Sequence, residues 1–305
     1  MKKVFIDGSA GTTGLKIRQR LQERKDITQI ILPEELRKDI SARKEAINQS
    51  DITFLCLPDD AAIEAASLCE NPSTVIIDTS TAHRTNPDWV YGFEEIVGKE
   101  KLAASKRIAN PGCHASGFIA LVKPLRDAGI LTEDARLSCF SLTGYSGGGK
   151  KMIAQYEDSE RDPLFDAPRQ YALTQNHKHL KEMSAICKVP SPVFCPIVGD
   201  FYSGMEVSVP LFSQDIKGSI EDIKAIYKEK YNSSIVHFDP EPAEEGFLSA
   251  GAFSERDDMQ ISVLGNSERM ILVARYDNLG KGASGSAVQN MNAVMGLDSA
   301  TGLNI

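Results

Sequence analysis

The stretch Val4-Phe5-Ile6-Asp7-Gly8-Ser9-Ala10-Gly11-Thr12-Thr13-Gly14 decides the fold of the first part of this chain. A short apolar run ends in a glycine-rich turn, and a helical pattern with Leu15, Ile17 and Leu21 follows. Strand, turn and helix with G-x-x-G-x-x-G spacing form a variant of the dinucleotide-binding fingerprint, because glycines permit the tight turn and a helix N-terminus attracts a pyrophosphate. We expect contacts to a dinucleotide from Gly8, Gly11, Thr12, Thr13 and Gly14. In the alternative interpretation the glycines only close the turn.

Further apolar runs without alternation follow this start. They cover Ile27 to Leu32, Asp51 to Leu57 and Thr74 to Asp78, and a helical pattern at Asp59 to Cys69 lies between the last two. Continuous strands separated by helices are typical of a parallel sheet that is covered on both faces. We therefore predict a doubly wound, Rossmann-type α/β domain over residues 1–112.

The pattern changes after residue 112, where several runs alternate between apolar and polar residues. Strands are expected at Leu137–Thr143, Val193–Val198, Met205–Phe212, Ile235–Phe238, Gln260–Leu264 and Met270–Tyr276. Helices are expected near Cys113, at His177–Cys187 and at Ile220–Tyr231. This predicts a second, α+β domain over 113–281 with a mixed, mostly antiparallel sheet, and a final helix over 282–305 that joins the first domain.

Composition excludes several classes of function. The 305-residue chain has a formal net charge of -8 and no basic block, so we expect neither nucleic acid nor a membrane surface as a partner. The six cysteines show no C-x-x-C spacing, and no apolar run approaches the roughly 18 to 20 residues of a membrane helix. We expect a cytoplasmic protein. No metal is expected, because Cys113, His114, His177 and His179 lack the compact spacing of zinc ligands.

The segment Ala109-Asn110-Pro111-Gly112-Cys113-His114-Ala115-Ser116-Gly117 brings a cysteine from a Pro-Gly turn to the first turn of the expected helix. Unpaired backbone N–H groups and the positive end of a helix dipole favour the thiolate there. Cys113 is therefore a candidate nucleophile. The alternative is a small buried cysteine beside a turn.

Charged residues follow the second expected strand, which ends without an Asp or Glu to bind a ribose diol. Arg37 and Lys38 stand there instead, and cations at this position fit a 2′-phosphate and hence NADP. A solvated charged loop is the alternative.

Two further loops hold candidate ligand contacts. In Asp78-Thr79-Ser80-Thr81-Ala82-His83-Arg84, the hydroxyl of Ser80 and the guanidinium of Arg84 follow a strand end, where they either orient a phosphate or carboxylate or merely cap a turn. In Thr143-Gly144-Tyr145-Ser146-Gly147-Gly148-Gly149-Lys150, glycines permit a close approach of backbone to a ligand, or simply form a surface loop.

Together these segments resemble the N-acetyl-γ-glutamyl-phosphate reductases of the short type and, more distantly, the aspartate-semialdehyde dehydrogenases. The similarity runs nearly end to end. Its most specific pieces are the turn Gly8 to Gly14, Leu57 to Ala62, Asp78 to Arg84 with Trp89 to Phe93, Asn110 to Cys113, and Asp277 to Ala283.

The resemblance implies an NADPH-dependent reduction of N-acetyl-L-glutamyl 5-phosphate to N-acetyl-L-glutamate 5-semialdehyde, a step of L-arginine biosynthesis. It makes Cys113 the nucleophile that forms a thioester. The family's His-x-Pro-Glu pattern appears here as His179-Leu180-Lys181-Glu182, which makes His179 the acid/base. Because Lys181 replaces the proline, His177 stays an alternative.

The resemblance also implies roles for other residues. It places Gly11 to Gly14, Ser80 and Asn278 near the cofactor and makes Ser146 and Gly147 candidate neighbours of the nicotinamide. Arg84 becomes a candidate substrate contact, and the second domain becomes the catalytic one in a homo-oligomer, either dimer or tetramer. Two alternatives remain: a related dehydrogenase for another acyl phosphate, such as aspartyl phosphate, and a catalytically silent nucleotide sensor.

Overall fold

The computed structural model describes residues 1–305 and divides into two compact units. The first comprises residues 1–112 and 283–303, and the second comprises 113–282 and 304–305. The first unit contains β1 (Lys2–Asp7), α1 (Thr12–Gln22), β2 (Ile27–Ile30), the 3₁₀ turn η1 (Glu34–Leu36), α2 (Ile40–Gln49), β3 (Ile52–Leu55), α3 (Asp59–Ser67), β4 (Val75–Asp78), β5 (Val90–Tyr91), α4 (Glu94–Val97), α5 (Lys99–Ala103), β6 (Arg107–Ala109) and α10 (Gly285–Met295).

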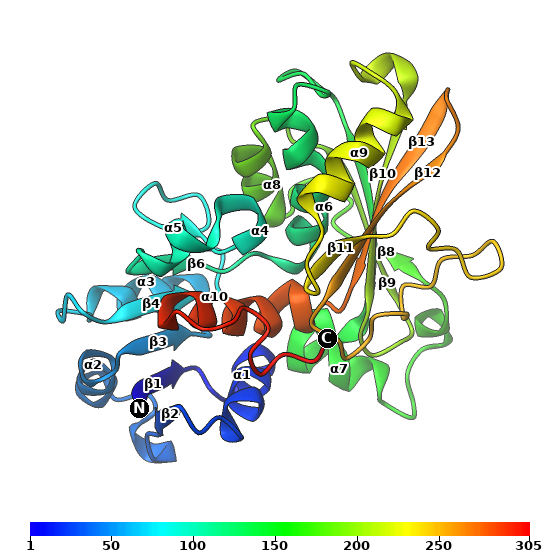
Figure 1. Cartoon of the computed structure of the whole chain (residues 1–305). Helices are drawn as coiled ribbons and strands as arrows, with labels where there is room; N and C mark the ends of the chain where they lie inside the picture. The colour runs from blue at the N-terminus through cyan, green and yellow to red at the C-terminus, as the bar shows by residue number, and fades with distance from the viewer. The chain divides into compact units, whose positions relative to one another are not determined.

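The strands of the first unit form one six-stranded sheet in the order β2-β1-β3-β4-β6-β5, and every neighbouring pair is parallel. Both faces are buried, as the continuous apolar strands require. Val4 and Ile6 of β1 pack in the core formed with α1, α5 and α10, whereas Phe5 packs in the core formed with α2 and α3. Figure 1 shows α10 between α1 and α5. The predicted doubly wound fold is confirmed.

The last helix is shorter than expected. The chain forms a π-helical turn, η5 (Gly280–Ser284), and then α10, which ends at Met295 because Gly296 adopts a left-handed conformation with φ of 69°. Residues after Gly296 form turns held by Asn292, whose side-chain amide donates to the carbonyls of Ser299 and Thr301. The expected helix over 282–305 is therefore wrong at its end: the chain is helical around residue 282, but no helix continues beyond Met295.

The second unit is built on a seven-stranded sheet in the order β11-β12-β13-β10-β7-β9-β8. Its elements are α6 (Cys113–Asp127), β7 (Ser138–Gly144), η2 (Tyr145–Gly148), α7 (Gly149–Tyr156), η3 (Pro163–Asp166), β8 (Arg169–Gln170), α8 (His179–Cys187), β9 (Val193–Gly199), β10 (Met205–Phe212), η4 (Ser213–Asp215), α9 (Ile220–Lys230), β11 (Val236–Phe238), β12 (Met259–Gly265) and β13 (Arg269–Tyr276). Pairs β11–β12 and β7–β9 are parallel and the other four pairs are antiparallel, which confirms the mixed sheet.

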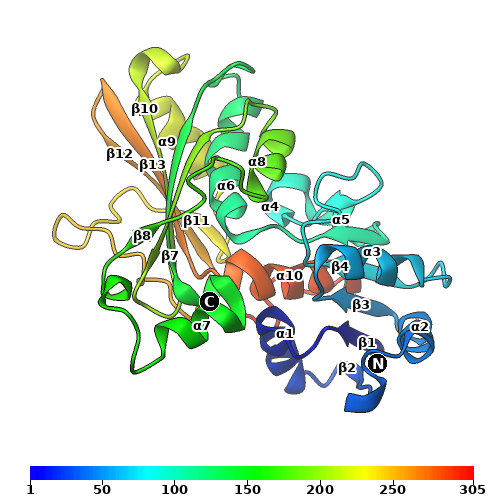
Figure 2. The same ribbon diagram turned by 180° about the vertical axis from the view of Figure 1, so that it is seen from behind.

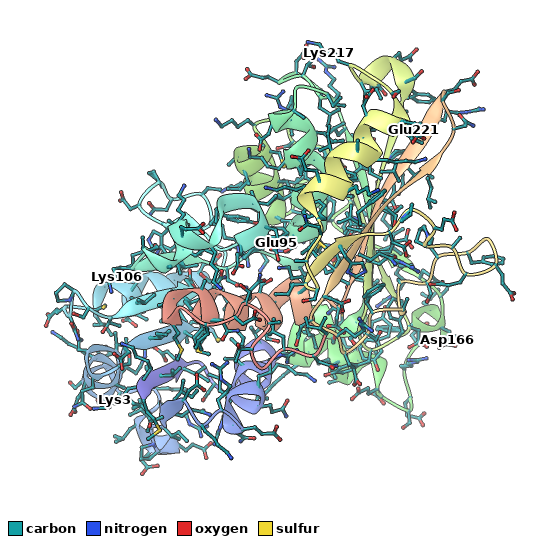
Figure 3. The ribbon with its side chains drawn as sticks, viewed as in Figure 1. Lys3, Glu95, Lys106, Asp166, Lys217 and Glu221 are labelled. Carbon is teal, nitrogen blue, oxygen red and sulfur yellow. The ribbon has the colours of Figure 1, made fainter.

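Helices α6, α8 and α9 lie on one side of this sheet, as Figures 1 and 2 both show. Strand β10 alternates accordingly: Val207 and Val209 are buried, whereas Pro210 is exposed. Charged side chains such as Lys217 and Glu221 project from the surface (Figure 3). No helix of the structure has the length and apolar character needed to cross a membrane.

Candidate active site

The glycine turn after β1 depends on two positions where no side chain fits. Gly8 has a φ of +84°, and a Cβ on it would lie 2.3 Å from the Cys56 carbonyl oxygen. A Cβ on Gly14 would lie 2.5 Å from the Gly8 carbonyl oxygen. Helix α1 then begins at Thr12 with no side-chain cap from Gly11, so the N–H groups of its first turn, Thr13 included, are oriented to bind an anion.

A cavity of about 470 Å³ opens beside this turn, at the carboxyl ends of β1 and β2. Its lining includes Gly8 and four cationic side chains: Arg18, Arg37, Lys38 and Arg43. The residues that directly follow β2 are Ile31 and Leu32, so no carboxylate occupies the position that binds a ribose diol in NAD-specific proteins. The predicted pair Arg37 and Lys38 lines this cavity together with the carboxylates of Asp7 and Glu34, and its contact with a nucleotide phosphate stays a prediction.

A buried ion pair forms one wall of the cavity. The Arg43 guanidinium lies 3.0 Å from a carboxylate oxygen of Asp7, the last residue of β1, and 3.1 Å from Glu64. Burial raises the pKa of the Asp7 carboxyl, and Arg43 acts in the opposite direction. Both side chains are over nine-tenths buried, so neither charge has bulk water as an alternative partner.

Ser80 lies in a rigid arrangement at the end of β4. Its hydroxyl donates to Asp78 Oδ2 at 2.7 Å, and its backbone N–H donates to Asp78 Oδ1 at 2.9 Å. The same carboxylate lies 2.7 Å from His83 Nδ1, and the His83 ring stacks on Trp89 with the ring centroids 3.9 Å apart. The position of the Ser80 hydroxyl is thus fixed, whereas its predicted contact with the cofactor stays a prediction.

Arg84 binds the backbone of its own unit. Its Nε donates to the Asn110 carbonyl at 2.9 Å, and its Nη2 donates to the Thr79 carbonyl at 3.0 Å. Asn110 is also held through its side chain, which donates to the Ala283 carbonyl and accepts from Asn290. Arg84 therefore anchors the loop that precedes the cysteine, and its predicted substrate contact stays a prediction.

Cys113 is half-buried and is the first residue of α6. Its carbonyl accepts a hydrogen bond of 2.6 Å from the Tyr276 hydroxyl, and a Cβ on Gly282 would lie 3.1 Å from the Cys113 Cβ. The Tyr276 hydroxyl thus fixes the backbone of Cys113, and the space beside its side chain at position 282 admits only glycine without a shift. Burial raises the pKa of the Cys56 thiol to about 12 and also raises the thiol pKa values of Cys139 and Cys187.

A group of imidazoles lies around the residue that follows Cys113. His114 Nδ1 lies 2.6 Å from the Ser141 hydroxyl, and its Nε2 lies 2.6 Å from the Tyr171 hydroxyl. Burial, together with nearby His177, lowers the pKa of His114 to about 3, so this imidazole is neutral at physiological pH. Its ring centroid is 5.7 Å from that of His177 and 5.5 Å from that of His179.

The two candidate acid/base histidines differ in their surroundings. His179 is buried at the start of α8, and its Nε2 lies 3.9 Å from a carboxylate oxygen of Glu182, one turn along the helix. His177 is half-buried, and its Nδ1 accepts the His179 backbone N–H at 3.2 Å. Burial and Lys178 lower the pKa of His177 to about 4, so His177 is a weak base. The carboxylate partner favours His179.

Asn278 organises the remaining candidates. Its Nδ2 donates to the Ser146 hydroxyl at 3.0 Å, and its Oδ1 accepts the Gly204 N–H at 2.9 Å. A Cβ on Gly147 would lie 3.3 Å from the Asn278 amide nitrogen. Ser146 and Gly147 are predicted from one loop and Asn278 from a distant segment, and the structure brings all three together.

The structure groups the other candidates by unit. Gly8, Arg37 and Lys38 line one cavity of the first unit, and His177 and His179 lie beside His114, the residue after Cys113, in the second. Ser141 and Tyr171 are not among the predicted residues, and His114 is considered there only as a metal ligand, although its position directly after Cys113 is a usable signal. No group of three or more His, Cys, Asp and Glu side chains is arranged to hold a metal ion.

Two family models match the chain. One, described as "Semialdehyde dehydrogenase, NAD binding domain", matches residues 3–105. The other, described as "Semialdehyde dehydrogenase, dimerisation domain", matches residues 113–278. The two matches fall in the two compact units of the structure.

Curated relatives cover nearly the whole chain. A protein of Brucella canis named N-acetyl-gamma-glutamyl-phosphate reductase is 46% identical over 96% of this chain and 99% of its own length. A Brucella suis protein of the same name is 45% identical over the same shares.

Solved structures share the fold. An aspartate semialdehyde dehydrogenase II from Vibrio cholerae matches with a TM-score of 0.73 and 17% identity over 97% of this chain and 98% of that one. An aspartate semialdehyde dehydrogenase from Candida albicans, solved with NADP, matches with a TM-score of 0.67 and 15% identity over the same shares. At these identities the likeness establishes the fold alone.

Proposed function

The chain belongs to the N-acetyl-gamma-glutamyl-phosphate reductase family, and on that premise we propose which of its residues carry out the family's reaction. The reaction is the NADPH-dependent reduction of N-acetyl-L-glutamyl 5-phosphate to N-acetyl-L-glutamate 5-semialdehyde and phosphate, a step of L-arginine biosynthesis. The similarity to curated relatives over 96% of the chain carries this conclusion.

Cys113 is the proposed nucleophile. It stands at the first turn of α6, where backbone N–H groups favour the thiolate, and it is only half-buried. Its thiolate attacks the acyl carbon, the bond from that carbon to the phosphate oxygen breaks, and inorganic phosphate leaves behind a thioester. Hydride addition to the thioester carbon gives the thiohemiacetal anion, whose bond from carbon to sulfur breaks to release the aldehyde and the Cys113 thiolate; one proton is then taken up from water before the next turnover.

His179 is the proposed acid/base. Its imidazole takes the proton of the Cys113 thiol and delivers it to the leaving phosphate, so this half-reaction balances without an added proton. The Glu182 carboxylate, 3.9 Å from Nε2, stabilises the imidazolium between the two transfers. His177 is the weaker candidate because its pKa is lowered to about 4.

The first unit fits an NADP cofactor, which in its reduced form, NADPH, would supply the hydride when bound. Its 470 Å³ cavity and the cations Arg37 and Lys38 suit a 2′-phosphate, and the first-turn N–H groups of α1 suit the pyrophosphate. Gly8, Gly11, Thr12, Thr13 and Gly14 then form the backbone contacts. As further cofactor contacts we propose Ser80, Ser146, Gly147 and Asn278. For the substrate phosphate or carboxylate we propose Arg84.

A homo-oligomer is also proposed, with a second copy of the chain on the outer face of the second unit's sheet. Phe140, Val193 and Ile271 are 46%, 57% and 45% exposed on that side, and an apolar hollow is lined by Phe140, Pro210, Leu264 and Ile271. Exposed apolar surface of this kind marks interfaces, and the family model for this unit names dimerisation. We also propose a cytoplasmic location, because all six cysteines are free thiols.

The deciding experiment follows NADP reduction that depends on phosphate, with N-acetylglutamate semialdehyde and, as a control, aspartate semialdehyde. The first substrate should be preferred, and NAD should replace NADP poorly. Cys113→Ser should abolish turnover while it spares NADPH binding. Turnover at the wild-type rate in Cys113→Ser would remove the proposed chemistry.

A matched pair of variants separates the two histidines. His179→Asn should lower kcat by roughly 10² to 10⁴-fold, the usual contribution of a general acid/base, whereas His177→Asn should have a smaller effect. The reverse order of effects would transfer the proton-moving role to His177.

A further inference from the structure

The Tyr276 hydroxyl bridges the first turn of α6. Tyr276 is the last residue of β13, and its hydroxyl accepts the Gly117 N–H at 3.0 Å and donates to the Cys113 carbonyl at 2.6 Å. Residues 113 and 117 supply the carbonyl and the N–H that an α-helix pairs across its first turn. One buried side chain thus binds both members of the pair that begins the helix.

The Tyr276 hydroxyl lies in a closely packed, buried site. Tyr276 is fully buried, and a Cβ on Gly117 would lie 2.7 Å from its hydroxyl oxygen and 2.6 Å from a methyl of Val207. Only glycine at position 117 leaves enough space for the Tyr276 hydroxyl. Burial raises the pKa of Tyr276 well above 10, and negative charge on Cys113 or Glu182 acts in the same direction, so the hydroxyl keeps the proton that it donates.

We propose that Tyr276 is a positioning residue for Cys113, whose hydroxyl keeps the first turn of α6 closed and thereby maintains the thiolate. Helix ends fray, and the N–H groups of the first turn favour an anion only while they keep their helical orientation. The same segment also passes close to the cysteine at Gly282, where an added Cβ would lie 3.1 Å from the Cys113 Cβ. This inference rests on the proposed function of Cys113 as the nucleophile.

The test compares Tyr276→Phe with Tyr231→Phe. Tyr231 is a matched control because its buried hydroxyl donates to the Ala120 carbonyl of the same helix at 2.7 Å, two turns beyond Cys113. The titratable groups around the start of α6 are kept in both variants: His114, Tyr171, His177, His179 and Glu182.

The measurement is the rate at which iodoacetamide alkylates Cys113, followed by peptide mass spectrometry between pH 5 and 9. Tyr276→Phe should raise the pKa of this thiol by about one unit, which lowers alkylation at neutral pH about tenfold. Its kcat should fall with the thiolate fraction while the Kd for NADPH stays unchanged. Tyr231→Phe should lower the Tm but leave the alkylation profile within about twofold of the wild type.

Two results would overturn the inference: an unchanged alkylation profile in Tyr276→Phe, or an equal change in both variants. If Tyr276→Phe does not fold, amide hydrogen exchange in the wild type tests the inference instead. A closed first turn should protect the Gly117 amide from exchange as well as the Leu121 amide further along α6. Fast exchange at Gly117 would also overturn it. Full turnover in Cys113→Ser would contradict the proposed function instead. The alkylation comparison would still measure the effect of Tyr276 on the Cys113 thiol.

Discussion

Replacing Arg43 with methionine should destabilise the first unit strongly at neutral pH and much less in mild acid. Arg43 lies 3.0 Å from the Asp7 carboxylate, and the two side chains are 8% and 5% exposed. The substitution keeps most of the apolar stem but leaves a buried carboxylate without its counter-ion. Breaking a buried ion pair in this way costs about 3–5 kcal/mol.

Proton uptake by Asp7 sets an upper limit on that loss. Holding a carboxyl of ordinary pKa 3.8 in its neutral form costs about 1.36 kcal/mol for each pH unit above that value, hence about 4 kcal/mol at pH 7 and about 1.6 kcal/mol at pH 5. Burial already raises the Asp7 pKa, and the variant loses the main opposing influence, Arg43. A carboxyl whose pKa is higher in the native state than in the unfolded state contributes stability that is lost as pH rises toward the native pKa. The free energy of unfolding of the variant should therefore fall from pH 5 to pH 7.

Urea unfolding at pH 5, 6 and 7, without nucleotide, measures this effect. The double variant Asp7→Asn with Arg43→Met should be about 2 kcal/mol more stable at pH 7 than Arg43→Met alone, because it leaves no buried charge. Glu64→Gln is the control: Glu64 is 48% exposed, so its loss should cost less than about 1 kcal/mol. A loss for Arg43→Met that is below about 1 kcal/mol, or the same at pH 5 and pH 7, refutes the reasoning.

Three further predictions follow from the site and its surroundings. Arg37→Gln with Lys38→Gln should raise the KM for NADPH at least tenfold and leave that for NADH nearly unchanged; equal changes for both cofactors would contradict the assignment. Gly282→Ala should lower kcat about tenfold or more, because the new methyl would lie 3.1 Å from the Cys113 Cβ, and steady-state kinetics at the wild-type level would count against this. Ile271→Glu should shift the oligomer toward monomer in light scattering, since it places a charge on the exposed sheet face; an unchanged mass would exclude that face as the interface.

Elements with a strong hydrophobic period could be predicted from the sequence. Strand β10 occupies Met205–Phe212 as expected, because alternation reports which side of a sheet is buried. The glycine-rich segment after β7 could not be predicted: a loop was expected, but η2 and α7 form there. The rings of Tyr145 and Tyr156 stack with their centroids 4.8 Å apart, and such packing overrides local propensity.

The same division applies to the site. Arg37 and Lys38 could be found because the end of the second strand is a fixed position in a doubly wound fold. His114 could not be assigned its role, since its partners Ser141 and Tyr171 lie 27 and 57 residues further along the chain. Pairings of this kind are set by tertiary structure, and no local spacing reports them.

The first unit is assembled from both ends of the chain, and this affects how it can fold during synthesis. All six strands of its sheet lie within residues 1–112, yet α10, which covers part of one face, is encoded after residue 282. The apolar face of this sheet therefore cannot be fully covered until the whole second unit has been synthesised, and a chain that stops before α10 leaves that face exposed.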